Sequence, residues 1–159
     1  MKGTLRVGSG IVGATSVALL NYLGSRYLPR APRLDILGLQ LAAAAFDKVG
    51  IRPPRGLPMK ILALVGSLVS NSMFYGLVGL GTPRTAWLRG AALGLAMGVG
   101  VLTLPAALGV GERETGRPPI AKVGTLAWYV LGGILAAITF AASQDEGKHR
   151  KRRSTKSPK

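Results

Sequence analysis

Residues 90–111 read GAALGLAMGVGVLTLPAALGVG, a stretch of 22 residues without a single charged side chain. A helix of about 20 apolar residues is long enough to cross the hydrocarbon core of a bilayer, which is about 30 Å thick. Inside lipid, every backbone polar group must find its hydrogen-bond partner within the protein, so a helix is the expected form. The stretch therefore predicts a transmembrane helix.

Three other stretches have the same character and cover residues 7–25, 61–83 and 123–144. The four stretches make up just over half of the chain, and we predict an all-α membrane protein with a four-helix transmembrane bundle. Alternatively, the first stretch is a cleaved signal peptide with a cleavage site at residues 16–18. The apolar run before that site is short and interrupted by glycine, which favours an uncleaved first helix.

The composition agrees with a membrane protein. Of the 159 residues, 48% are hydrophobic and 17% are charged, with 21 Lys and Arg against 6 Asp and Glu, for a net charge of +15. A soluble domain carries about 25% charged residues. Few charges, nearly all of them basic, are typical of transmembrane helices with positive flanks. Because the chain has no cysteine, disulfides, thiolate metal sites and cysteine nucleophiles are excluded.

The longest connection between spans covers residues 26–60 and contains one further helical pattern. Apolar residues from Leu34 to Ala45 recur at helical spacing, which predicts a helix over residues 34–50. Its uncharged run of 11 residues, 36–46, is too short to cross a bilayer. We expect a short interfacial or re-entrant helix in this first loop, or alternatively a helix that packs on the bundle.

The end of the chain, residues 145–159, is strongly basic. It cannot bury an apolar core, and we expect it to be a disordered tail. Anionic lipid headgroups are its expected partners, at about 1 kcal/mol for each basic residue near the surface. The basic residues expected to contact them are Lys148, Arg150, Lys151, Arg152 and Arg153. Nucleic acid is a less favoured partner, because no aromatic side chain between the basic ones could stack on bases.

The orientation in the membrane follows from the basic residues that flank the spans. With four spans, both termini lie on one side, which collects 11 Lys and Arg against 10 on the other. The dense basic cluster directly after the last span resists translocation and favours cytoplasmic N- and C-termini.

Small residues recur at a spacing of four in several spans. Gly90, Gly94 and Gly98 share one face of the third predicted helix, and Gly132 and Gly133 lie in the last one. Without a Cβ, two helix backbones approach closely, and this packing replaces the hydrophobic driving force that lipid removes. These glycines predict helix packing, either within the bundle or between separate chains.

Polar residues gather near the middle of the second span, at Ser67, Ser70, Asn71 and Ser72. Polar side chains inside a membrane cost free energy unless they meet partners or water. They tie helices together, or alternatively line a polar path or hold a ligand. Asn71 is the first candidate for such an intramembrane polar site, because its amide offers both donors and acceptors.

Three other residues of the predicted spans carry local expectations. Trp128 and Tyr129 lie near the start of the last span and are interpreted as aromatic anchors at the membrane interface. Pro105, late in the third span, lacks a backbone donor and predicts a bend in that helix.

The chain lacks the residues of most enzymatic sites. Its one histidine, His149, lies in the tail, and the spans contain no ionisable side chain of the kind that pumps and intramembrane proteases need. Catalytic triads, zinc sites and haem ligation lack their residues as well. The candidates for an enzyme that acts on lipid are Asp35, Asp47 and Arg30. Asp35 and Asp47 would be about 18 Å apart on a continuous helix, which is too far for them to act as a pair. We therefore expect no enzymatic activity, no cofactor and no metal.

Several short motifs follow one another from the second span onward. They are NSMFYGLVG at Asn71, GAALGL at Gly90, LPAALG at Leu104, RPP at Arg117 and LAW at Leu126. In this order the chain resembles the YagU-type family of uncharacterised bacterial inner-membrane proteins, over about two thirds of its length. The resemblance implies a four-helix layout in a bacterial inner membrane. The chain lacks the membrane histidines of that family, so no activity is carried over.

These patterns lead to a functional hypothesis. We expect a small polytopic integral membrane protein that acts as an accessory or scaffold subunit, through helix packing with itself or with a larger membrane complex. The alternative is a small transporter or a holin-like pore-forming protein, which the polar residues of the second span favour.

Overall fold

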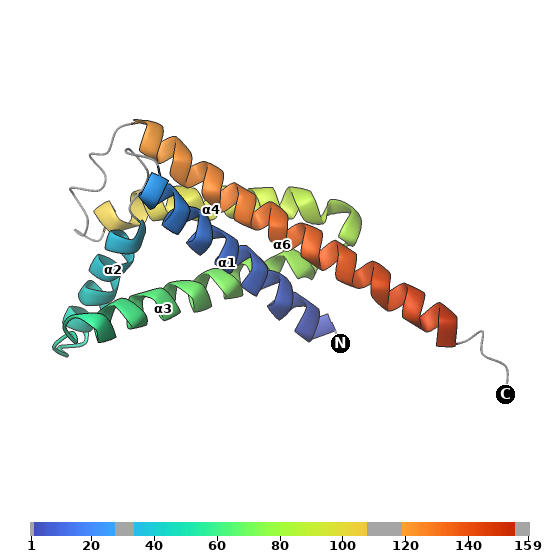
Figure 1. Ribbon diagram of the computed structural model, residues 1–159, viewed down its shortest axis with the longest axis horizontal. Helices are drawn as coiled ribbons and strands as arrows, with labels where there is room; N and C mark the ends of the chain where they lie inside the picture. Colours follow the sequence, from blue (N-terminus) through green and yellow to red (C-terminus); the bar gives the residue numbers. More distant parts are fainter. Residues whose placement is uncertain (1, 28–33, 108–118, 155–159) are drawn as a thin grey trace.

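The computed structural model describes residues 2–27, 34–107 and 119–154, and the regular structure in these residues is entirely helical (Figure 1). The α-helices are α1 (Lys2–Tyr27), α2 (Leu34–Lys48), α3 (Leu57–Gly76), α4 (Ala86–Ala107) and α6 (Pro119–Ser154). Two short 3-10 helices, η1 (Leu77–Leu80) and η2 (Pro83–Thr85), join α3 to α4.

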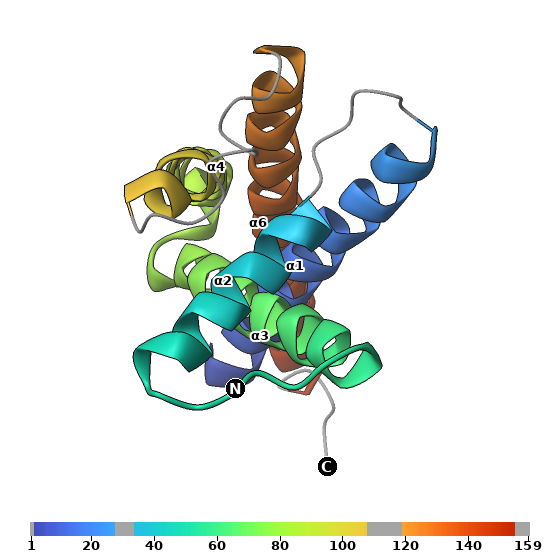
Figure 2. The ribbon, with the colours of Figure 1, turned by 90° about the vertical axis from the view of Figure 1, so that its left-hand side faces the viewer.

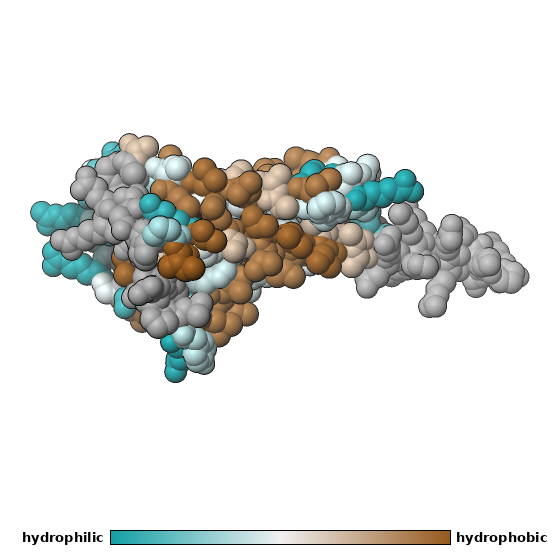
Figure 3. Space-filling model, turned by 90° about the horizontal axis from the view of Figure 1, so that it is seen from above, coloured by the Kyte–Doolittle hydropathy of each residue, from teal (hydrophilic) through white to brown (hydrophobic). Residues whose placement is uncertain are grey.

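Among the described residues, four helical segments are long and apolar enough to cross a membrane. They are Thr4–Tyr27, Leu57–Leu80, Pro83–Pro105 and Pro119–Gln144. The predicted fold, an all-α bundle with four spans, is confirmed. Figure 3 shows hydrophobic side chains along the middle of the bundle and hydrophilic ones toward its ends, as expected for a protein surrounded by lipid.

The spans pack in an order that differs from their order in the sequence. α6 lies between α4 and α1, and α1 lies between α6 and α3 (Figure 2). α3 and α4 are neighbours in the sequence but stand at the two ends of this row, with few contacts between them. The long central helices α1 and α6 therefore carry most of the packing, and α3 and α4 keep most of their surface free of protein.

Small residues set the distance between these helices. A Cβ placed on Gly94 of α4 would lie only 2.7 Å from the Cα of Val130 on α6. On the other side of α6, a Cβ on Gly13 of α1 would lie 2.9 Å from the carbonyl oxygen of Gly132. Backbones in contact gain dispersion energy that side chains at these positions would prevent.

α2 is the short helix predicted in the first loop, and it packs against α3. It ends at Lys48 because Gly50 adopts a left-handed φ of 70°, a conformation that closes the last turn and that glycine adopts at no steric cost. Leu37 is the buried anchor of its inner face. The geometry matches the alternative in which this helix packs on the bundle.

The tail is where the fold departs most from the prediction. α6 continues as a helix to Ser154, ten residues past the predicted end of the last span at Gln144, so the expectation of disorder from residue 145 is wrong for this part. Extending an existing helix needs no new nucleation, and Lys, Arg and Glu are good helix formers. Basic side chains are also favourable at a helix C-terminus. Residues 155–159 lie outside the described part of the chain.

Candidate functional site: a polar cleft within the spans

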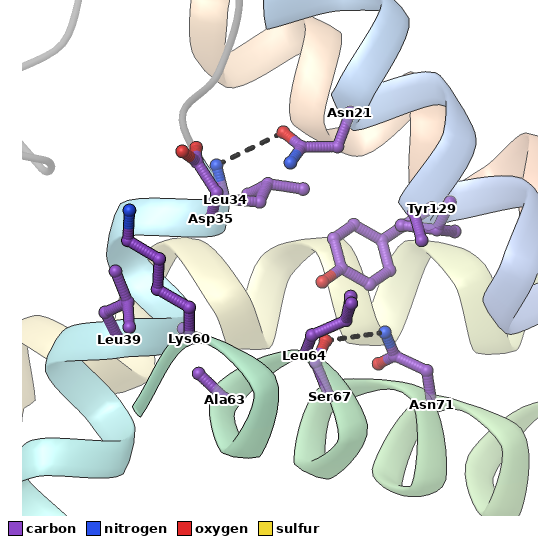
Figure 4. A pocket seen from close by; sticks show the side chains of 13 residues that line it. Asn21, Leu34, Asp35, Leu39, Lys60, Ala63, Leu64, Ser67, Asn71 and Tyr129 are labelled. Atoms are coloured by element: carbon purple, nitrogen blue, oxygen red, sulfur yellow. Dashed lines mark hydrogen bonds between the residues drawn. The ribbon is translucent and has the colours of Figure 1, made fainter. Parts of the chain in front are cut away.

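A cleft with a volume of about 300 Å³ opens between α1, α2, α3 and α6 (Figure 4). Its apolar walls come from Val17, Ala18, Leu34, Leu39, Ala63 and Leu64, and Gly38 leaves space beside them. Its polar lining consists of Asn21, Asp35, Lys60, Ser67, Asn71 and Tyr129. Apolar walls with a small number of convergent polar groups are typical of sites that bind small molecules.

The polar groups follow one face of α3. Lys60, Ser67 and Asn71 all line the cleft, at spacings that return to the same side of a helix. From Lys60 in the first turn of α3 to Asn71, the helix rises about 16 Å. The cleft therefore extends from the end of the span, where the charged group lies, to its middle, where the uncharged polar groups lie.

Asn71 is the buried amide of the cleft, with 7% of its surface exposed. Its Nδ2 donates to the Oγ of Ser67 over 3.4 Å, which is long for a hydrogen bond. The side chain also interacts with the hydroxyl of Tyr129 from α6. A buried amide costs free energy when its hydrogen bonds are weak, so Asn71 gains from any additional partner that enters the cleft.

The upper wall of the cleft is fixed by a helix cap. The Oδ1 of Asn21 on α1 accepts a hydrogen bond of 3.2 Å from the backbone N–H of Leu34, the first residue of α2. The first N–H groups of a helix have no partner within it, and a side-chain oxygen satisfies one of them. Asp35, which follows, adds a carboxylate to the first turn of α2. This cap joins α2 to α1 across the cleft.

The four polar residues predicted as a site in the second span lie in three different places. Ser67 and Asn71 lie together in the cleft. Ser70 is exposed on the outer side of α3. Ser72 faces α1, where its carbonyl oxygen contacts Gly10. The sequence therefore located two members of the cleft, and it missed the contributions of Asn21, Asp35, Lys60 and Tyr129.

The position of Tyr129 differs from the sequence interpretation. It was expected at the membrane interface, but it is buried, with 5% of its surface exposed, and belongs to the central apolar cluster. Its backbone carbonyl accepts a hydrogen bond of 2.7 Å from the hydroxyl of Tyr75, which is completely buried. Tyr129 shares a face of α6 with Gly133 and Ala136, and that spacing is the signal that could have placed it inside.

The predicted packing glycines lie at helix contacts within the chain. Gly90 of α4 faces the backbone of Gly133 on α6, and Gly94 faces that of Tyr129. One turn further, a Cβ on Gly98 would lie 3.0 Å from a side-chain carbon of Leu126. Gly132 faces α1 on the opposite side of α6. The geometry thus corresponds to the alternative in which these glycines pack helices of one bundle.

Two arginines that the sequence analysis did not single out hold the turn after α3. The Nε of Arg6 donates to the carbonyl oxygen of Gly79 over 3.1 Å. The guanidinium of Arg89 donates to the carbonyl oxygens of Val78, at 3.0 and 3.1 Å, and of Thr82, at 2.7 Å. Carbonyls at the end of a helix lack partners within it, and these donors supply them. This is the end of the bundle opposite the cleft.

Other parts of the predicted site set are as follows. The tail residues Lys148, Arg150, Lys151, Arg152 and Arg153 lie on the last turns of α6, and their side chains are outside the described part of the structure. The described residues contain no cluster of three His, Asp or Glu side chains that could hold a metal ion.

Comparison with family models, curated proteins and solved structures finds no match to this chain. The resemblance to the YagU-type family therefore stays a prediction. What the chain can do must be inferred from its own geometry.

Proposed function

We propose that this small polytopic membrane protein acts as an accessory or scaffold subunit, which packs through its spans against itself or against a larger membrane complex. The outer face of α3 carries the proposal. Gly66 and Ser70 lie four residues apart on this face, both exposed, and no atom lies within 4 Å of a Cβ placed on Gly66. Small residues at this spacing let a second helix approach closely in lipid.

The same face offers apolar surface around the two small residues. Leu62, Val69 and Met73 are exposed along it, Met73 to 72%. The predicted packing glycines, by contrast, already contact helices of the same chain, and they are Gly90, Gly94 and Gly98 of α4 and Gly132 and Gly133 of α6. The free small-residue face of α3 is thus the better candidate for an external helix.

A pair of matched glycine variants tests this proposal. Gly66→Leu places a large side chain on the outer face of α3, and Gly8→Leu does the same on α1, where a Cβ also has nothing within 4 Å. Both variants leave the internal packing intact. We expect Gly66→Leu to release the partner or the second copy, and Gly8→Leu to retain it. The measurement is native mass after purification in mild detergent, with identification of co-purifying proteins.

The result also decides between the two kinds of partner. A larger protein in fixed stoichiometry identifies an accessory subunit, and a multiple of the mass of this chain identifies self-association. A monomer without partners in the wild type, or equal retention by Gly66→Leu and Gly8→Leu, contradicts the proposal.

A second candidate function is a small transporter or holin-like pore, and the polar cleft is the observation that favours it. A transport role for the cleft predicts that induced expression makes cells permeable to small solutes. The variant Asn71→Leu, which removes the buried amide, should then abolish the leak. Absence of a leak in cells that express the wild type counts against this candidate.

We place the protein in a bacterial inner membrane with both termini in the cytoplasm, where the basic end of α6 contacts anionic lipid headgroups. The basic tail directly after the last span supports this orientation. Since the chain has no cysteine, Arg55→Cys and Ser157→Cys each introduce a single thiol. An impermeant thiol reagent on intact cells should label only residue 55. Labelling of residue 157 would reverse the orientation.

A further inference from the structure

We propose that the cleft between α1, α2, α3 and α6 binds one phospholipid with a zwitterionic headgroup. The headgroup lies at Lys60 and Asp35, and an ester carbonyl of the lipid lies against Ser67, Asn71 and Tyr129. The inference concerns the cleft alone and does not depend on the docking face of α3.

Access to the cleft is from the bilayer. Leu64 and Ser67 line the cleft and are exposed, Leu64 to 54%. Both lie well inside the span Leu57–Leu80. A side chain exposed at this depth faces hydrocarbon, so the cleft is open to molecules that are soluble in the membrane.

Among the described residues, the charged side chains that line the cleft are those of Lys60 and Asp35. Lys60 lies in the first turn of α3, and Asp35 lies in the first turn of α2 (Figure 4). An ammonium group near the end of a span is placed to bind a lipid phosphate. Asp35 adds a carboxylate to the same cleft, so the charged side chains that line it match a headgroup with both a phosphate and an amine.

The deeper part of the cleft matches the uncharged linkage of a lipid. Ser67 lies seven residues beyond Lys60, about 10 Å along the helix axis, and Asn71 lies one turn further. In a phospholipid the ester carbonyls follow the phosphate toward the acyl chains, and a carbonyl oxygen accepts hydrogen bonds. Ser67, Asn71 and Tyr129 each carry a hydrogen-bond donor. Because the hydrogen bond between Asn71 and Ser67 is long, the buried amide can form a better one with a ligand.

The walls complete the match, because Val17, Leu39 and Leu64 offer apolar surface to the first carbons of an acyl chain. Gly38 has no atom within 4 Å of a Cβ position, so α2 leaves room for the ligand where a side chain would fill it. A cleft of about 300 Å³ accommodates the headgroup region of one lipid and not the whole molecule, whose chains extend into the bilayer.

The test is lipid retention by the full chain in nanodiscs that contain phosphatidylethanolamine and phosphatidylglycerol in equal amounts. After transfer to mild detergent, native mass spectrometry counts the lipids that remain bound. We expect one phosphatidylethanolamine per chain. Lys60→Gln and Asn71→Leu should each weaken its retention about tenfold, the effect of losing one hydrogen bond that involves a charged or buried group.

Two further variants keep the test decisive. Tyr129→Phe removes a single hydroxyl and should lower retention even if Asn71→Leu fails to fold. Ser70→Ala removes a hydroxyl of α3 outside the cleft and should leave retention unchanged, whatever it does to the partner on the outer face. Equal retention by all variants would mean ordinary surrounding lipid and would overturn the proposal. Preferential retention of phosphatidylglycerol would overturn it too, and so would the absence of any retained lipid.

Discussion

The two ends of the bundle are built in opposite ways. At the end that carries the chain termini, one turn, η1, contacts α1 through Arg6, α4 through Arg89 and α6 through Phe140, which lies beside Gly79. At the other end, α2 crosses α3 and the cleft remains open between four helices. A small membrane protein can thus fix its arrangement at one end and leave a cleft open at the other.

The chemistry of the two ends explains the contrast. At the closed end, backbone carbonyls accept hydrogen bonds from guanidinium groups, and bonds from a charged donor are stronger than those between neutral groups. At the open end, polar side chains face a space, and the hydrogen bond between Asn71 and Ser67 is long, at 3.4 Å.

The largest expected effect is on the contact between α4 and α6. In Gly94→Ile, the new Cβ would lie 2.8 Å from the carbonyl carbon of Tyr129, and the branched side chain would separate the two backbones. We expect a destabilisation of about 3 kcal/mol or loss of monodisperse protein. Gly100→Ile is the control, since a Cβ on Gly100 meets nothing within 4 Å. The measurement is thermal unfolding in detergent, and equal stability of the two variants would remove the proposed role of this contact.

The sequence predicts the elements of this fold better than their arrangement. Charge-free runs of about 20 residues located the four spans, because the thickness of the bilayer alone sets that length. Which face of a span meets another helix is not visible in this way, since lipid and protein interior are equally apolar. Tyr129 was therefore placed at the interface, and the pairing of α4 with α6 was not predicted.

The candidate site, too, was predicted only in part. Asn71 and Ser67 were found because polar groups inside a span are unusual. Asn21, Asp35 and Lys60 lie near the ends of helices, where polar residues are ordinary and carry no signal. Only the fold brings them to the same cleft. Arg6 and Arg89 were likewise counted as flanking charges, although their guanidinium groups bind η1 and the turn that follows it.

A smaller effect is expected at the closed end. Arg89→Lys keeps the positive charge but loses the planar fork that reaches Val78 and Thr82 at once. We expect the free energy of unfolding to fall by about 1.5 kcal/mol, the cost of carbonyls that lose a charged donor. Arg84→Lys, at an exposed position of η2, should leave stability unchanged. If thermal unfolding cannot distinguish the two variants, the arginine contacts do not fix this end.

The smallest effect on stability, and the sharpest contrast, is expected at Gly38→Leu. At the closed end an added side chain breaks a helix contact, but Gly38 lines the cleft and has open space around it. Replacing a helical glycine should raise stability by about 0.5–1 kcal/mol, because the unfolded chain loses conformational freedom. The leucine would at the same time occupy the space proposed for the lipid. We therefore expect a slightly higher unfolding temperature together with reduced retention of phosphatidylethanolamine. A lower unfolding temperature would mean that this end of the bundle is packed as tightly as the other.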